Sequence, residues 1–352
     1  MGKIFDENMI VKKGATRPGI KYYSLDDGDF SIYGLIKTDE GYVRLPKEVA
    51  ERVSAGIAHD YINTAGGRIR FITDSPYVAV SAEITEIYQF YSMSILSTCG
   101  IDVYFDGEFA GVIRPNPQNP ETHISDVINA PCGGEHLVEI NLPLYAGVGE
   151  IGIGVVGGAV IKSAPKYKYE KPIVFYGSSI TNGACASRPG LSYPAKLSRM
   201  LDVNHINLGF GGLCKGEQAM TDYIAGLDMS VFVLDYDYNA PNAEYLEKTH
   251  EKAYLTVREK NPELPIVMIS CPRADLSGEW GKRLEIIKRT YNNALEAGDK
   301  NVYMINGSEI FAEIGHDYAS DGVHPNDLGF DLMAKAVYPI LKKALEEKYT
   351  EN

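Results

Sequence analysis

The sequence lacks the features of a membrane-bound or disulfide-rich protein. Its 352 residues contain 5 scattered cysteines and no Cys-x-x-Cys pair, which is neither a disulfide framework nor a zinc module. No apolar run approaches the ~20 residues of a membrane-spanning helix, and the opening MGKIFDENMI has no apolar signal-peptide core. We therefore expect a cytoplasmic protein with reduced, mostly buried thiols and no membrane partner.

Positive charge is also scarce. The chain has 34 Lys and Arg against 47 Asp and Glu, for a formal net charge of -13. Nucleic acids and anionic membranes favour clustered Lys and Arg, so we expect no nucleic-acid partner. The hydrophobic share of 45% and the charged share of 23% are ordinary for a globular protein, and the length favours two compact domains.

Several common catalytic motifs are missing. The sequence contains no Walker A motif, no HExxH and no G-x-S-x-G. GVGEIG (147–152) matches the dinucleotide fingerprint, but the strand-like IGVVGGAVI follows it where a helix is required. We expect neither a bound cofactor nor a metal.

The first half of the chain has the pattern of an antiparallel β-domain. Short runs of β-branched and aromatic residues alternate with Gly, Pro, Asp and Asn, as in GGRIRFITDS, YVAVSAEI and EHLVEINLPLY. Asp106-Gly107 within VYFDGEFAG is a hairpin signal, because this pair tolerates the positive φ angles of a two-residue loop. The pattern predicts a β-sandwich or jelly roll over residues 1–162.

A lysine-rich stretch with two prolines, KSAPKYKYEKP, follows and predicts a linker over residues 163–172. Beyond it, strand-like runs alternate with helical ones, and the runs are PIVFYG, HINLGF, MSVFVLDY, PIVMIS and NVYMING. Such alternation predicts a parallel sheet covered on both faces. We therefore expect residues 173–352 to form a five-stranded, flavodoxin-like α/β domain, whose ligands bind beyond the carboxyl ends of the strands.

Polar residues with chemical potential follow these strands. Ser179 comes just after the first strand, where a base could activate its hydroxyl. In SDGVHPND, Asp321 and His324 are spaced so that the carboxylate can hold the imidazole Nδ1–H and leave Nε2 free to face a serine. Taken singly, the first is equally consistent with a polar turn or helix cap, and the second with a surface turn before the last helix.

Two further strand-end segments offer donors for a substrate oxyanion. NLGFGG (207–212) brings glycines that let a backbone N–H approach closely, and LDYDYNAP offers the side-chain amide of Asn239. Each is an ordinary loop by itself. Together with Ser179, Asp321 and His324 they fall at strand ends of one predicted sheet, and this conjunction is more specific than its parts.

The second domain resembles the SGNH, or GDSL-type, hydrolases, whose sequence blocks supply a serine, a glycine, an asparagine and a histidine. GSSI resembles the first block, with Ser178 in place of the usual aspartate, and implies Ser179 as nucleophile. NLGFGG implies Gly212 as the oxyanion glycine, and DGVHPND implies Asp321 and His324 as the rest of the triad. In the third block LDYDYN replaces the usual G-x-N-D and places Asn239 slightly late.

The first domain resembles the β-sandwich that precedes the hydrolase domain in one subgroup, through GIDVYFDG and its similarity to a G-x-D-L-Y signature. The sequence leaves open whether Asp102 and Tyr104 serve function or hold the sandwich together.

The resemblance implies a metal-free serine ester hydrolase that forms an acyl-enzyme. We expect it to remove short acyl groups, notably acetyl, from a carbohydrate, an oligosaccharide or a small metabolite. The oxyanion would meet the backbone N–H groups of Ser179 and Gly212 and the Asn239 amide. Two alternatives are an acyltransferase with the same acyl-enzyme and a non-catalytic carbohydrate-binding protein. The sequence leaves open whether the protein forms a homo-oligomer.

Overall fold

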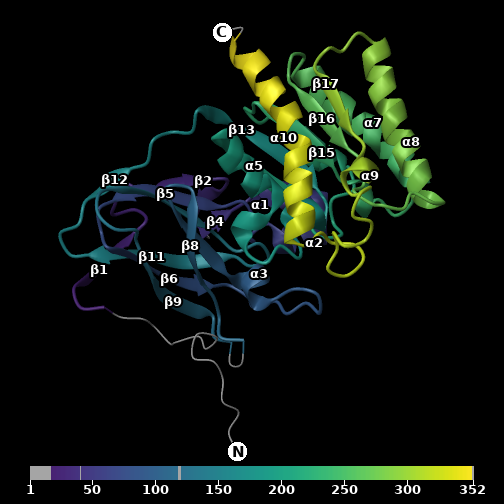
Figure 1. The fold of residues 1–352 in the computed structure, drawn as a ribbon. Coiled ribbons are helices and arrows are strands. Elements are labelled where there is room, and N and C mark those ends of the chain that lie inside the picture. Colours follow the sequence, from purple (N-terminus) through teal and green to yellow (C-terminus); the bar gives the residue numbers. More distant parts are fainter. Residues whose placement is uncertain (1–16, 40, 118–119, 351–352) are drawn as a thin grey trace, which may run out of the picture.

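The structure, a computed structural model, describes residues 17–39, 41–117 and 120–350. It consists of an N-terminal half built on antiparallel sheets and a C-terminal α/β half (Figure 1). The opening segment MGKIFDENMI, on which we based the expectation of no signal peptide, lies outside the described residues.

Two antiparallel sheets form the N-terminal half, in the orders β1-β11-β6-β9 and β12-β5-β10-β7-β8, with β2 paired to β5. The apolar side chains between them form one core, which includes Phe71, Val80, Val103 and Ile140. The strands of the first sheet are β1 (Ile20–Ser24), β6 (Tyr77–Ile84), β9 (His123–Asn129) and β11 (Val148–Val156). Those of the second are β2 (Ser31–Tyr33), β5 (Arg68–Thr73), β7 (Ile101–Phe105), β8 (Glu108–Ile113), β10 (His136–Asn141) and β12 (Ile161–Ser163).

The predicted hairpin is present between β7 and β8. Asp106 has φ 52° and Gly107 has φ 87°, the positive pair that a tight hairpin turn requires. The hairpin carries the G-x-D-x-Y segment, so Asp102 and Tyr104 lie on β7 with a fixed register to β10.

The N-terminal half also contains helices that the sequence pattern did not lead us to expect. They are α1 (Lys47–Val53), α2 (Ala55–Asp60) and α3 (Ile95–Cys99), and a small hairpin of β3 (Ile36–Thr38) and β4 (Gly41–Val43) precedes the first two. Val49 and Ile57 from α1 and α2 belong to the same apolar core as Phe210, Met220 and residues of the parallel sheet. This segment therefore packs on the C-terminal half rather than within a sandwich.

The C-terminal half confirms the predicted five-stranded parallel sheet, in the order β14-β13-β15-β16-β17. Its strands are β13 (Tyr169–Gly177), β14 (Val203–Gly209), β15 (Val231–Asp235), β16 (Ile266–Ile269) and β17 (Val302–Ile305). Its helices are α4 (Ser179–Asn182), α5 (Tyr193–Leu201), α6 (Gln218–Ala225), α7 (Ala243–Lys260), α8 (Glu279–Glu296), α9 (Gly307–Ile310) and α10 (Asp327–Thr350). Apolar residues of α5 and α10 pack on one face of the sheet, and those of α6, α7 and α8 on the other.

The parallel sheet begins inside the segment predicted as a linker, because β13 starts at Tyr169 and pairs with β14 from there. The predicted boundaries at residues 162 and 172 remain predictions. Of the cysteines, Cys99, Cys185, Cys214 and Cys271 are buried and Cys132 is exposed, and all are free thiols.

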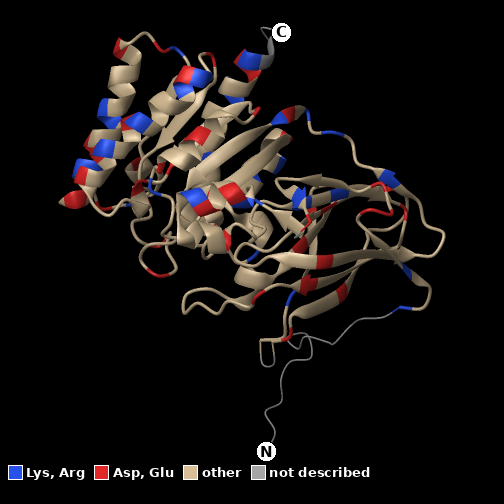
Figure 2. Cartoon of the chain, turned by 180° about the vertical axis from the view of Figure 1, so that it is seen from behind, with Lys and Arg blue, Asp and Glu red and all other residues tan. Residues whose placement is uncertain are grey.

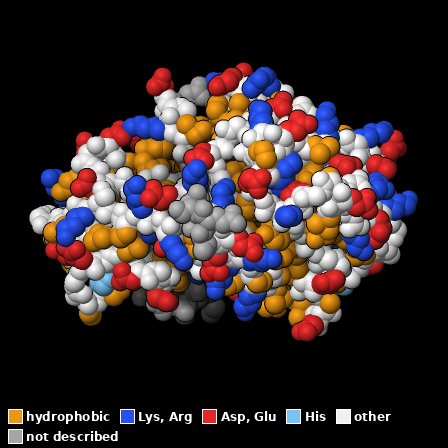
Figure 3. Space-filling model, turned by 90° about the horizontal axis from the view of Figure 1, so that it is seen from above, with side chains coloured by type: hydrophobic (Ala, Val, Ile, Leu, Met, Phe, Trp, Pro, Cys, Tyr) orange, Lys and Arg blue, Asp and Glu red, His pale blue; other side chains and the backbone are white. Residues whose placement is uncertain are grey.

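Charged residues of both signs alternate along the outer helices of the α/β half (Figure 2) and are interspersed over the face shown in Figure 3. Within the described part of the chain, none of the helices combines the length and the apolar character needed to cross a bilayer.

Candidate active site

Three strand ends of the parallel sheet meet in register next to Ser179. Gly177 of β13 pairs with Gly209 of β14 on one side and with Asp235 of β15 on the other. A Cβ on Gly177 would lie 2.0 Å from the Thr181 hydroxyl, and one on Gly209 would lie 2.3 Å from the Asn182 amide nitrogen. Only glycine fits at these two positions, so α4 is seated directly on the strand ends.

Ser179 is the first residue of α4, and Ser178 caps that helix by accepting a hydrogen bond from the Ile180 N–H at 3.1 Å. Ser178, which replaces the usual aspartate of the first sequence block, is thus the cap of α4. Ser179 follows it, and its hydroxyl lies at the edge of the sheet. The Ser179 Oγ lies 2.9 Å from Nε2 of His324.

The structure places the Asp321 carboxylate beside the His324 ring, on the side away from Ser179. The carboxylate Oδ2 lies 2.8 Å from His324 Nδ1, while Oδ1 accepts the backbone N–H groups of His324 at 2.8 Å and Val323 at 3.0 Å. The carboxylate is only 5% exposed. Burial opposes ionisation, but the hydrogen bonds from His324 and Val323 outweigh it and lower the pKa of Asp321 to about 2.

The candidate oxyanion segments lie against this pair. A Cβ placed on Gly211 would be 3.7 Å from Ser179 Cβ, so the glycine turn passes beside the nucleophile. Gly212 follows with φ 69° and open space where a side chain would stand. The Asn239 amide donates to the Phe210 carbonyl at 3.0 Å, which fixes the third segment to the same turn.

A buried carboxylate, which the sequence did not lead us to expect in the site, lies behind α4. Asp235, at the end of β15, accepts hydrogen bonds at 2.8 Å from the hydroxyls of Thr181 and Tyr193. Burial and the neighbouring Asp237 carboxylate raise the pKa of Asp235 to about 7. Asp235 therefore anchors the nucleophile helix from inside the protein.

Arg44 of the N-terminal half reaches the same place. Its guanidinium stacks over the Phe210 ring at 3.7 Å and donates to Asn182 Oδ1 at 2.9 Å and to the Gly209 carbonyl. The side chain is 2% exposed. Since Asn182 ends α4 and Phe210 begins the glycine turn, one arginine holds both segments of the site.

Tyr145 and Cys185 complete the surroundings of Ser179. The Tyr145 hydroxyl lies 3.5 Å from the position of a Cβ on Gly211. The Cys185 thiol donates to the Ser92 carbonyl at 3.4 Å, and burial raises its pKa. Tyr145 belongs to no motif, and Cys185 begins the CASRPG segment that follows the nucleophile, but neither residue was assigned a role in the site from the sequence.

Cys185, Asp321 and His324 form the group of candidate metal ligands in the described part of the chain, with ligand atoms all within 4.8 Å of one another. Asp321 and His324 are already hydrogen-bonded to each other, and the Cys185 thiol is bonded to a carbonyl. These partners suit a proton relay better than a metal centre.

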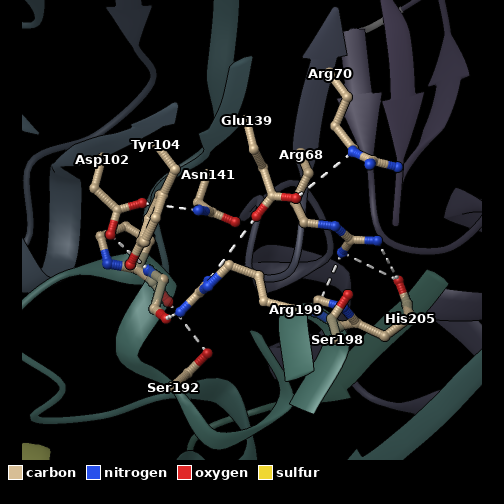
Figure 4. A network of polar contacts seen from close by, with 12 residues as sticks. Arg68, Arg70, Asp102, Tyr104, Glu139, Asn141, Ser192, Ser198, Arg199 and His205 are labelled. Atoms are coloured by element: carbon tan, nitrogen blue, oxygen red, sulfur yellow. Dashed lines mark hydrogen bonds and ion pairs between the residues drawn. The ribbon is translucent and has the colours of Figure 1, made fainter. Parts of the chain in front are cut away.

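Asp102 and Tyr104 connect the two halves of the molecule. Asp102 Oδ2 accepts the Gly190 N–H at 2.8 Å and pairs with Arg188 at 3.0 Å, and the Tyr104 hydroxyl also contacts Arg188. Figure 4 shows the wider polar network in which Asp102, Tyr104 and Glu139 of the N-terminal sheet face Arg199 of α5. These residues therefore do more than hold the sandwich together.

The segment held by Asp102 also reaches the start of α10. Ser187 donates to Asp327 through its backbone N–H at 2.8 Å and through its hydroxyl at 2.6 Å. The segment after the nucleophile is thus tied to the segment after His324.

Comparison with known proteins agrees with this architecture. Residues 170–342 match the GDSL-like Lipase/Acylhydrolase family, and residues 20–161 match the N-terminus of SGNH-hydrolase-type esterases that carries the GxDLY motif. None of the curated proteins matches the sequence. The chain belongs to the SGNH, or GDSL-type, hydrolase family.

Solved structures share the fold over nearly the whole chain. A GDSL-like lipase from Bacteroides ovatus is 29% identical with a TM-score of 0.83, covering 93% of this chain and 98% of its own. A salicylyl-acyltransferase from a tetracycline biosynthetic pathway is 21% identical, with a TM-score of 0.77 and the same coverage. A family two carbohydrate esterase from Clostridium thermocellum, in complex with cellohexaose, is 17% identical with a TM-score of 0.62, covering 90% and 99%.

Proposed function

We propose that the protein is a serine ester hydrolase that removes short acyl groups, notably acetyl, from a carbohydrate or small hydroxylated metabolite. The observation that carries the proposal is the relay in which Ser179 Oγ lies 2.9 Å from His324 Nε2 and His324 Nδ1 lies 2.8 Å from Asp321. An imidazole held in this way presents Nε2 to the serine proton.

In this mechanism Ser179 attacks the ester carbonyl while His324 accepts its proton. Asp321 keeps the imidazole oriented and stabilises its cationic form, and its low pKa keeps it ionised throughout. The tetrahedral oxyanion is met by the backbone N–H groups of Ser179 and Gly212 and by the Asn239 amide. His324 then protonates the leaving alcohol, and water repeats the sequence on the acyl-enzyme.

The test is hydrolysis of 4-nitrophenyl acetate by the wild-type protein, Ser179→Ala and Ser178→Ala. Ser178 is the matched control because it is the adjacent serine but uses its hydroxyl as a helix cap. We expect Ser179→Ala to lose the activity and Ser178→Ala to keep most of it. Equal activity in wild type and Ser179→Ala would refute this assignment of the nucleophile.

Acyl transfer is a second outcome of the same acyl-enzyme, and a fold neighbour is named as an acyltransferase. In that case an alcohol replaces water in the last step. Adding a sugar acceptor and quantifying acylated sugar against free acid separates the two reactions, and a majority of acylated sugar would replace hydrolysis by transfer.

A further inference from the structure

The loop between β6 and α3 (Figure 1), which we call the aromatic loop (residues 86–93), carries a group of exposed aromatic rings. Tyr91 is 95% exposed and Phe90 is 43% exposed. The rings of Tyr88 and Phe90 stack with centroids 5.8 Å apart and an interplanar angle of 14°. Large apolar rings left in solvent beside a catalytic group are typical of a binding surface.

Side-chain contacts place this loop next to the nucleophile. The Phe90 ring packs edge-on against Tyr145, with centroids 5.4 Å apart. The Tyr145 hydroxyl lies close to Gly211, next to the position that a Cβ on this glycine would occupy. That position is 3.7 Å from Ser179 Cβ. Phe90 is thus linked to the surroundings of Ser179 through Tyr145 and the glycine turn.

The loop is also fixed to the catalytic segment at its far end. Its Ser92 carbonyl accepts the hydrogen bond from the Cys185 thiol, and Cys185 follows directly on the turn that ends α4. Met93 packs against the apolar core of the α/β half. At the other end, the Tyr88 carbonyl accepts a hydrogen bond from the Thr98 hydroxyl at 2.9 Å. The exposed part is thus held on both sides of Phe90 and Tyr91, whose rings remain open to solvent.

The polar groups beside the rings indicate what the surface binds. His59 Nδ1 lies 2.9 Å from Asp60 and 3.5 Å from the Tyr88 hydroxyl, and His59 Nε2 lies 3.9 Å from Glu86. Two carboxylates and one imidazole give this rim a net negative charge whether the His59 ring is neutral or protonated. The carboxylates can accept hydrogen bonds from hydroxyl groups, but they repel an anionic ligand such as a phosphate or a uronate. An aliphatic chain at this place would be disfavoured because it would lie against charged groups.

We propose that the aromatic loop is the subsite for an uncharged sugar ring on the alcohol side of the ester. A pyranose has apolar C–H faces that pack on aromatic rings and equatorial hydroxyls that donate to carboxylates at their edge. The loop then holds the sugar while its ester group lies at Ser179. This inference rests on the proposed function for the ester chemistry, but sugar binding to the loop can be measured in the absence of any ester hydrolysis.

The kinetic test compares wild type, Phe90→Ala, Tyr91→Ala and the control Tyr22→Ala, since Tyr22 is also 43% exposed but lies on β1. The substrates are an acetylated methyl xyloside and vinyl acetate, which has no ring, both followed by pH-stat titration. For the sugar ester we expect KM to rise about tenfold in Phe90→Ala and Tyr91→Ala, as for a lost aromatic contact. Their kcat, their activity on vinyl acetate and both activities of Tyr22→Ala should stay within about twofold of wild type.

Three kinetic results would overturn the proposal. An unchanged KM for the sugar ester in both loop variants removes the loop from binding, and an equal loss on vinyl acetate shows that the rings only support the catalytic residues. Vinyl decanoate, followed in the same way, is a third substrate, and a loss of activity confined to it would place the acyl chain on the loop in place of the sugar.

Binding separates this inference from the proposed chemistry. The Ser179→Ala protein, with and without Phe90→Ala, is titrated calorimetrically with xylohexaose, cellohexaose and mannohexaose. Binding of any of them that Phe90→Ala weakens supports the subsite even where no ester is hydrolysed. If none of the three oligosaccharides binds to the folded protein, the subsite proposal is overturned, whatever the esterase activity.

Discussion

Asp102 of the N-terminal half lies 3.0 Å from Arg188 of the α/β half, and Asp102 is fully buried. Burial raises the pKa of Asp102, and Arg188, the Gly190 N–H and the Asn141 amide act in the opposite direction. The residue that gives the N-terminal region its sequence signature is therefore a contact between the two halves, and it holds the segment that follows the nucleophile.

Replacing Asp102 by alanine leaves Arg188 without its buried partner. We expect Asp102→Ala to lower the free energy of unfolding by about 3 to 5 kcal/mol, as for a buried ion pair that loses one member. The measurement is urea unfolding followed by circular dichroism. The control is Asp26→Ala, because the Asp26–Lys37 pair is largely exposed and should cost less than about 1 kcal/mol. Equal effects for the two variants would contradict the anchoring role of Asp102.

Asp321→Asn should preserve the fold and abolish most of the catalysis. An asparagine can hold His324 in the wrong tautomer, and the corresponding change in a serine protease lowers kcat by about 10⁴-fold. The measurement is kcat on an activated acetyl ester, with a circular dichroism spectrum to verify folding. Asp317→Asn, at a nearby exposed position, is the control and should leave kcat within about twofold. A loss of less than about tenfold would speak against the relay.

Asn239→Ala tests the third oxyanion donor. Loss of one preorganised donor typically lowers kcat by about 10²–10³-fold, and KM should change little because the donor acts on charge that develops in the transition state. Asn239→Asp keeps the size of the side chain but removes the donor, so its kcat should fall as much as that of the alanine variant. An unchanged kcat in both would leave Asn239 with only its structural bond to the Phe210 carbonyl.

Asp235 provides a prediction about pH and stability. Its pKa is raised from 3.8 to about 7 in the folded protein, so the folded state loses stability relative to the unfolded one as pH rises from about 4 to 7. We expect Asp235→Asn to be more stable than wild type by roughly 2 to 4 kcal/mol at pH 8, with the difference vanishing near pH 4. Its amide oxygen can still accept from Thr181 and Tyr193.

Urea unfolding of Asp235→Asn and wild type at pH 4, 6 and 8 measures this difference. A difference that does not grow with pH would show that Asp235 is ionised in the fold at no cost. Thr181→Val at the same three pH values is a useful companion, since it removes a hydrogen bond to Asp235 without removing the titrating group.

The sequence was sufficient for the parts of the site that lie close along the chain or end a strand. All five parallel strands were predicted because each is a short apolar run that ends in glycine or a polar residue. Ser179 and His324 meet because both follow strands at one edge of that sheet. Arg44 and Tyr145 could not be predicted. Each is a single residue outside any motif, and each contacts a part of the site that is far away in the sequence.

Asp102 was identified in the sequence, but its role was left open because a motif does not say which way a side chain points. On β7 it points toward the α/β half, and only the register with β10 and the position of Arg188 show this. Likewise, α1 and α2 were missed because their apolar positions are few and separated by charged residues, and their stability comes from packing on a distant part of the chain.

The packing of α1 and α2 means that the two halves cannot be prepared as independent pieces. Val43, Leu45, Val49 and Ile57 are buried in the same apolar cluster as Phe210, Met220 and other residues of the α/β half. A fragment that begins at the parallel sheet would expose this apolar surface and lose Arg44. The whole molecule should therefore unfold as a single cooperative unit, although it is built from two architectures.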